Sequence, residues 1–163
     1  MQPAEHALIA IDIQNDFCPG GALAVDEGDA VVPQVNALMD DFAVRVLTQD
    51  WHPEDHLSFA ANHAGAAPFS MTEMPYGPQV LWPRHCVQGT EGAAFHRALR
   101  TNPADLILRK GFRAGIDSYS AVDAARLGYN VTVMLAACRA IDMDGSLAAA
   151  MQDMRTHGVR LEG

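Results

Sequence analysis

The chain has 163 residues, the length of one domain, and its 49% apolar content is enough for a core, which excludes intrinsic disorder. Asp and Glu number 20 against 11 Lys and Arg, so the formal net charge of -9 disfavours nucleic acid and anionic membrane surfaces as partners. The apolar run over residues 7–11 is too short for a membrane span or a secretory signal, which makes a cytoplasmic location the expectation.

In chain order, the apolar pattern predicts strands that alternate with helices. The expected strands cover residues 7–11, 43–49, 106–108, 131–135 and 159–161. The expected helices cover residues 31–42, 90–100, 120–127 and 144–156. Residues 51–90 are irregular, and loops of that length in compact domains are usually functional. The alternation predicts one α/β domain over residues 1–163, a three-layer arrangement with a mostly parallel sheet flanked by helices.

Three polar residues follow the carboxyl ends of three predicted strands, where ligands bind in such sheets: Asp12, Asp50 and Lys110. Lys110 is the only lysine, because the other ten basic residues are arginine. A buried lysine can exchange protons and an arginine cannot, so Asp12 and Lys110 together suit proton transfer. The simpler alternatives are a surface lysine kept by chance and a strand-end carboxylate that caps a loop.

The segment that follows the second strand has the character of a metal site. Asp50 and His52 project to the same side of an extended chain, and Pro53 then turns it so that His56 can swing back. His85 could supply a fourth ligand. One carboxylate and three imidazoles suit Zn, Fe or Mn as a divalent ion. The alternative is a pair of surface histidines beside a turn.

Five ordered blocks of the sequence resemble the nicotinamidase/pyrazinamidase branch of the isochorismatase-like cysteine hydrolases. The blocks are IDIQNDFCPGGALAV, TQDWHPEDHLSFA, LWPRHCVQGTEGAAFH, RKGFRAGIDSYSA and the C-terminal LGYNVTV with ACRAID. The resemblance implies a six-stranded parallel sheet and the hydrolysis of nicotinamide to nicotinate and ammonia through a cysteine thioester, a step of NAD salvage. Nicotinamide and pyrazinamide are the implied small-molecule partners, and a homo-oligomer is compatible with the sequence.

The resemblance also assigns roles to individual residues. It makes Asp12 the catalytic carboxylate and Lys110 the active-site lysine. It assigns the ligands of one divalent metal ion, which lies beside the substrate and holds the ring nitrogen, to Asp50, His52, His56 and His85. It assigns the walls of the pyridine pocket to Phe17, Leu23 and Trp82.

The sequence departs from this family at the nucleophile. The family's block of the form G-[LI]-A-T-D-x-C-V does not occur here, and residues 118–122 run directly into residues 123–129. The family sequence that has no counterpart here corresponds to about one strand-plus-helix unit, on the order of 30–50 residues. We therefore expect an internal deletion near residues 122–123. We also expect the loss of a central strand next to the first one. Cys18, Cys86 and Cys138 do not match the position of the nucleophile, and their odd count argues against a disulfide framework.

Three functions stay open at this point. The first is a nicotinamidase-type amidohydrolase whose sequence here is incomplete. The second is a catalytically inactive homologue that binds metal and nicotinamide. The third is another cysteine hydrolase of the superfamily, acting on a ureido or carbamoyl substrate.

Overall fold

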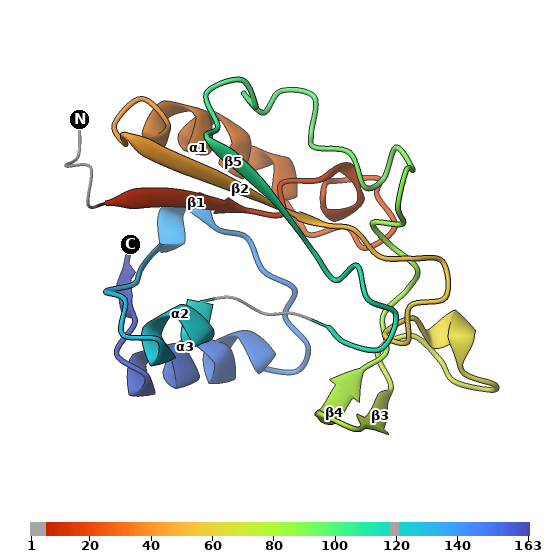
Figure 1. Cartoon of the computed structure of the whole chain (residues 1–163). Coiled ribbons are helices and arrows are strands. Elements are labelled where there is room, and N and C mark those ends of the chain that lie inside the picture. The colour runs from red at the N-terminus through yellow and green to blue at the C-terminus, as the bar shows by residue number, and fades with distance from the viewer. Residues whose placement is uncertain (1–5, 118–120) are drawn as a thin grey trace. The chain divides into compact units, whose positions relative to one another are not determined.

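The computed structural model describes residues 6–117 and 121–163, and the spatial contacts of the chain define two compact units with a boundary between residues 117 and 118 (Figure 1). The order of strands and helices confirms the predicted α/β class. The prediction of one domain over the whole chain, with an internal deletion, stays a prediction. Among the described residues, every helix is too short or too polar to cross a membrane.

The first unit is built on a three-stranded parallel sheet. Its strands are β1 (Ala7–Ile11), β2 (Val44–Asp50) and β5 (Leu106–Lys110), in the order β1-β2-β5. These apolar, partly β-branched runs suit parallel strands. The register places Ile11 beside Thr48 and Asp50 beside Lys110, so the carboxyl ends of all three strands lie at one edge.

One helix, α1 (Val32–Leu38), begins after a 3-10 turn over Gly28–Val31 and buries an apolar stripe. It is shorter than the helix predicted over 31–42. The guanidinium Nε of Arg45, on β2, donates to the Met39 carbonyl at 2.7 Å and ties the end of the helix to the sheet. Met39 is fully buried, so the helix contributes to the core of this unit.

The long connection between β2 and β5 folds on itself instead of staying irregular. It contains a 3-10 turn (Ala60–Asn62) and an antiparallel hairpin of β3 (Met71–Met74) and β4 (Gly77–Val80), which the sequence analysis missed. Phe59 and Leu81 bury their side chains almost completely. A predicted functional loop is therefore also a source of core packing.

The helix predicted over residues 90–100 is wrong. Its expected capping bond exists, because the Ala93 N–H donates to Thr90 Oγ1 at 3.3 Å. The turn does not continue, since the Gly92 and Ala94 carbonyls accept hydrogen bonds from the backbone of residues 15–16. Pairing with the loop after β1 thus replaces the helical hydrogen bonds.

The second unit contains α2 (Ala121–Arg126), β6 (Thr132–Met134), a 3-10 turn (Leu135–Ala137), α3 (Ser146–Thr156) and β7 (Arg160–Glu162). β6 and β7 pair in parallel, with Thr132 beside Arg160. The elements expected here from the sequence are confirmed, with ends shifted by one or two residues. Val159 is the only residue that is buried among those described in this unit.

Candidate active site and metal centre

The three residues predicted at the strand ends meet in the structure. The Lys110 ammonium lies 2.7 Å from Asp12 Oδ2 and 2.5 Å from Asp50 Oδ1, so one lysine bridges two carboxylates. All three side chains are largely buried, with exposed fractions of 10–15%. The predicted proximity of Asp12 and Lys110 is confirmed. The second ion pair, between Lys110 and Asp50, was not predicted from the sequence.

Asp12 is held in an uncommon backbone conformation. Its φ of 53° lies in the left-handed region, which a residue other than glycine keeps only when its surroundings enforce it. Thr48 provides that constraint, because its hydroxyl donates to Asp12 Oδ1 at 2.7 Å and its carbonyl accepts the Asp12 N–H at 3.2 Å. The sequence analysis missed Thr48, although its place two residues before Asp50 puts both on the same face of β2.

The charges of this cluster favour proton handling at Asp12. Burial, and then the neighbouring Asp50, raise the pKa of Asp12 above its usual value. Burial would lower the pKa of Lys110, but the two carboxylates outweigh it and raise that pKa, so the ammonium stays charged. A carboxyl with a raised pKa beside a permanent cation is suited to accept and return a proton.

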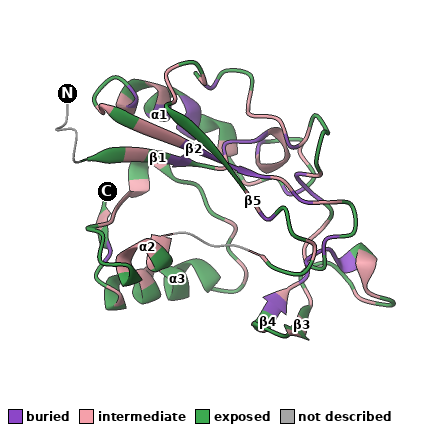
Figure 2. Cartoon of the chain, viewed as in Figure 1, coloured by how far each residue is buried: buried purple, intermediate pink, exposed green. Residues whose placement is uncertain are grey.

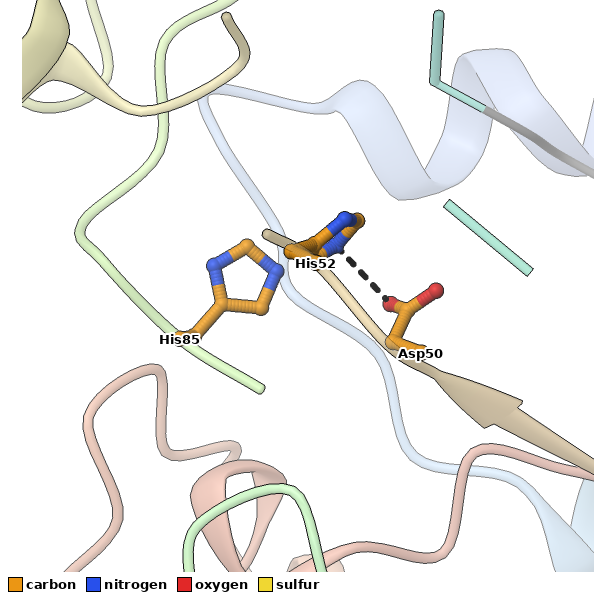
Figure 3. A group of neighbouring side chains, drawn as sticks. All are labelled: Asp50, His52 and His85. Carbon is orange, nitrogen blue, oxygen red and sulfur yellow. Dashed lines mark ion pairs between the residues drawn. The ribbon is translucent and has the colours of Figure 1, made fainter. Parts of the chain in front are cut away.

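Next to this pair, Asp50, His52 and His85 form a candidate metal centre (Figure 3). All three are buried, and one ligand atom from each lies within 4.8 Å of the others. His52 Nδ1 lies 2.9 Å from the Gly111 carbonyl, and His85 Nδ1 lies 2.8 Å from the Pro83 carbonyl. Each Nδ1–H can donate to that carbonyl, which leaves both Nε2 atoms free as ligands, the arrangement common to metal-binding histidines.

His56 lies beside this centre but outside the group of three. Its ring centroid is 4.3 Å from that of His52, its Nδ1 is 2.7 Å from Ser58 Oγ, and its Nε2 is 3.3 Å from the Ile116 carbonyl. Its role as a fourth ligand stays a prediction, and it requires Nε2 to leave that carbonyl.

The electrostatics of the centre suit a cation. Burial raises the pKa of Asp50, but His52 and Lys110 outweigh it and lower that pKa to about 2, so the carboxylate is charged at neutral pH. Burial lowers the pKa of His85 and of His56, which favours the neutral imidazole that binds metal. Burial also opposes charge on His52, but the contact with Asp50 outweighs it and raises the pKa of His52 overall.

Two neighbouring residues, Gly111 and Gln14, fix the positions of the ligands His52 and Asp50. Gly111 has a φ of 62°, and a Cβ there would lie 2.4 Å from the His52 ring, so only glycine permits this approach. The fully buried Gln14 accepts the Asp50 N–H and donates to the Asp50 carbonyl, both at 2.8 Å. Sequence reasoning identified Gln14 only as a polar turn residue, and it did not single out Gly111.

One predicted pocket wall, Phe17, lies against a residue of the metal centre. Phe17 is half-buried, and its ring centroid lies 5.5 Å from that of His85. Leu23 is buried, and Trp82 packs edge-on against Phe69. A hollow elsewhere on the surface is lined by Gln49, Phe95, Ile107 and Arg109 and includes none of the predicted walls. The pyridine pocket therefore stays a prediction.

The cysteines lack the features of an activated nucleophile. Burial raises the pKa of Cys18, and burial with the nearby Asp50 raises that of Cys86 far above its usual value. The exposed Cys138 also has a raised pKa, again because of local burial of the thiol. A reactive cysteine needs a lowered pKa, so each of the three is a protonated thiol at neutral pH.

Comparison with known proteins identifies the family. The family model described as the isochorismatase domain matches residues 6–119, well over half of the chain. The chain belongs to the isochorismatase family. A nicotinamidase of Acinetobacter baylyi is 44% identical over 193 aligned positions, covering 94% of this chain and 90% of that relative. A nicotinamidase of Escherichia coli is 34% identical over 200 positions, covering 96% of this chain and 93% of the relative.

Solved structures give the same family. A nicotinamidase/pyrazinamidase of Acinetobacter baumanii, 42% identical, superposes with a TM-score of 0.97 over 99% of this chain and 97% of its own. A pyrazinamidase of Pyrococcus horikoshii in complex with zinc, 30% identical, has a TM-score of 0.77 over 96% of this chain and 98% of its own. The predicted isochorismatase-like fold class is confirmed.

Proposed function

We propose that this chain is a nicotinamidase-type amidohydrolase and carries the acid/base and metal parts of its active site. The reaction converts nicotinamide and water to nicotinate and ammonia, which returns the pyridine ring to NAD salvage. The observation that carries the proposal is Lys110, whose ammonium joins the proton-handling Asp12 to the metal-binding Asp50 within 2.7 Å of each. The nicotinamidases of Acinetobacter baylyi and Escherichia coli support it.

Amide hydrolysis through a thioester needs two proton relays, one to form the thioester and one to cleave it, and Asp12 suits both. It takes the proton from the attacking thiol and gives it to the leaving nitrogen, which departs as ammonia. It then takes a proton from the water that cleaves the thioester and returns it to the thiol. Lys110 holds the carboxylate in place through its contact with Oδ2, and Thr48 holds the other oxygen.

The donor set suits a divalent ion held by Asp50, His52 and His85, with His56 as a proposed fourth ligand. The two free Nε2 atoms and the low pKa of the Asp50 carboxyl support this assignment. When bound, such an ion acts as a Lewis acid toward the ring nitrogen of the substrate. Zinc, iron and manganese all fit one carboxylate with imidazoles, and the zinc complex of the Pyrococcus horikoshii pyrazinamidase supports zinc.

Binding of nicotinamide tests the proposal without requiring turnover. We expect the zinc-loaded 163-residue chain to bind nicotinamide in calorimetry and to bind benzamide at least tenfold more weakly, since benzamide lacks the ring nitrogen. The His85→Ala variant should lose that discrimination. Equal binding of the two amides by a chain that holds its zinc would contradict the proposed function.

A further inference from the structure

One aromatic ring packs against both histidines of the metal centre and against His56. Phe59 is the largest completely buried side chain of the described residues, and buried residues recur from β2 into the chain that follows it (Figure 2). The Phe59 ring centroid lies 5.5 Å from that of His52 and 5.5 Å from that of His85. It lies 5.7 Å from that of His56. A single side chain therefore contacts every imidazole gathered here.

The angles between these rings make the contacts directional. The Phe59 ring lies at 86° to His52 and at 67° to His85, so both contacts are edge-to-face. Aromatic rings at such distances prefer this arrangement, because the positive edge of one ring meets the negative face of the other. The Phe59 ring thus restricts the rotation of the two imidazoles and also excludes water from their sides.

The backbone holds Phe59 in this place. The Phe59 N–H donates to the His56 carbonyl at 3.1 Å. On either side of Phe59, the Ala60 N–H donates to the Trp82 carbonyl at 2.9 Å, and the Trp82 N–H donates to the Ser58 carbonyl at 2.7 Å. Phe59 is therefore tied to the turn after β2 and to the segment that leads to the other histidine of the metal centre.

The far end of that segment is tied to His52. The His52 N–H donates to the Cys86 carbonyl at 3.0 Å, and the Gln88 N–H donates to the His52 carbonyl at 2.9 Å. His85 lies between the two tied ends, so its backbone is fixed next to Phe59. The fold thus brings the rings together through contacts that do not involve the imidazole nitrogen atoms.

Hydrogen bonds alone do not set the orientation of the two imidazoles. Each Nδ1 has a carbonyl partner, Gly111 for His52 and Pro83 for His85. A ring held at one atom can still turn about that hydrogen bond. The Phe59 ring contacts both imidazoles away from that atom, and it supplies the second constraint that each ring needs.

We propose that Phe59 is a positioning residue of the metal centre, whose ring holds the imidazoles of His52 and His85 in the orientation that binds a divalent ion. The inference rests on the proposed function, which assigns the ion to these residues. Phe59 carries no ligand atom, so its contribution comes from packing alone. Rings that are already oriented lose less freedom when the ion binds, which raises affinity.

Zinc affinity and the visible absorption of bound Co²⁺ test this role. Phe59→Leu keeps an apolar side chain but removes the ring, and it should weaken zinc binding by about 10–100-fold in competition with a chromophoric chelator. The Co²⁺ bands should change in position and intensity, because they report the arrangement of the ligands. Phe59→Met, which is flexible and adapts to gaps in a core, should show the same changes and replaces the leucine variant if that one does not fold.

Met39→Ala is the matched control. Met39 is also completely buried, and its carbonyl binds Arg45 near the start of β2, whereas Asp50 lies at the end of that strand. In urea unfolding with a chelator present, Met39→Ala should lose at least as much stability as Phe59→Leu. It should keep the zinc affinity and the Co²⁺ bands of the unaltered chain.

Two results would overturn the positioning role of Phe59 alone. One is unchanged zinc affinity and Co²⁺ bands in the Phe59 variants. The other is an equal loss of affinity in Met39→Ala, because a general loosening of the core would then be the cause. Failure of the unaltered chain to bind either ion overturns the metal assignment in the proposed function together with this inference, so the two failures are distinguishable.

Discussion

The two compact units follow the same strand-helix pattern but differ in their cores. In the first unit, Met39, Leu47 and Phe59 have exposed fractions of 1% or less. In the second, Val159 is the only residue that is buried among those described, and Leu127 and Tyr129 are 78% and 70% exposed. The acid/base pair and the metal centre both lie in the unit with the core.

This difference shows what a strand-helix pattern needs before it can support chemistry. Catalytic and metal-binding side chains must be held by neighbours whose own positions are fixed by packing. The first unit supplies such neighbours in Thr48, Gln14 and Gly111. The second unit has elements of the same kind, but Val159 alone among its described residues is buried.

The largest expected effect is on turnover. The first unit supplies Asp12 and Lys110 but lacks an activated thiol among its described residues, so the 163-residue chain should release ammonia from nicotinamide about 10⁶-fold more slowly than an intact relative. The assay uses protein whose intact mass matches 163 residues. Turnover near that of an intact relative, abolished by replacing Cys18, Cys86 or Cys138 with alanine, would contradict the expectation.

The next largest expected difference between the two units is the loss of stability when a leucine is replaced by alanine. Leu47→Ala, in β2, removes a side chain that is 1% exposed and should lower the free energy of unfolding by about 2–5 kcal/mol. Leu127→Ala, at a 78% exposed position in the second unit, should change it by less than about 0.5 kcal/mol. Urea unfolding measures both, and similar losses in the two variants would mean that the second unit has a core of its own.

Metal affinity should depend on the first unit alone. His85→Ala removes one of the three gathered ligands and should weaken zinc binding by more than about 100-fold, since even supporting residues of metal sites contribute 10–100-fold. His157→Ala, at the end of α3, is the matched control and should bind zinc like the unaltered chain. Competition with a chromophoric chelator gives both affinities.

Acid should weaken the first unit selectively. The pKa of the Asp50 carboxyl is lowered from 3.8 to about 2, so the charged form stabilises the metal-free fold by about 2 kcal/mol above pH 4. That stabilisation should disappear as the pH falls from about 4 to about 2. Asp50→Asn should remove this contribution to the pH dependence, and Asp123→Asn, on the exposed surface of α2, should keep it. Unfolding in the presence of a chelator, at steps of pH, measures the difference.

The smallest expected effect is on zinc affinity, when the glycine that packs against His52 is replaced by alanine. Gly111→Ala places a Cβ 2.4 Å from the His52 ring and should weaken zinc binding about tenfold. Gly115→Ala is the control, because a Cβ there meets nothing within 4 Å. Equal affinities in the two variants would show that the His52 ring can shift without losing the metal.

Much of this arrangement was predictable from local patterns. Short apolar runs that end in polar residues identified all three strands of the sheet, and with them the positions of Asp12, Asp50 and Lys110. The helix expected over residues 90–100 failed, because its carbonyls bind the loop after β1 instead of their own chain. The hairpin of β3 and β4 was missed within a segment rich in proline and aromatic residues.

The sequence by itself determined the fold class, the strand ends and the types of side chain that gather there, since these follow from apolar periodicity and the direction of parallel strands. Only the tertiary structure decided that Lys110 bridges Asp12 and Asp50, because that contact depends on the register between β2 and β5. The tertiary structure also decided that Thr48 holds Asp12 in a left-handed conformation, a contact between residues 36 positions apart in the chain. Local patterns carry no information about such distant contacts.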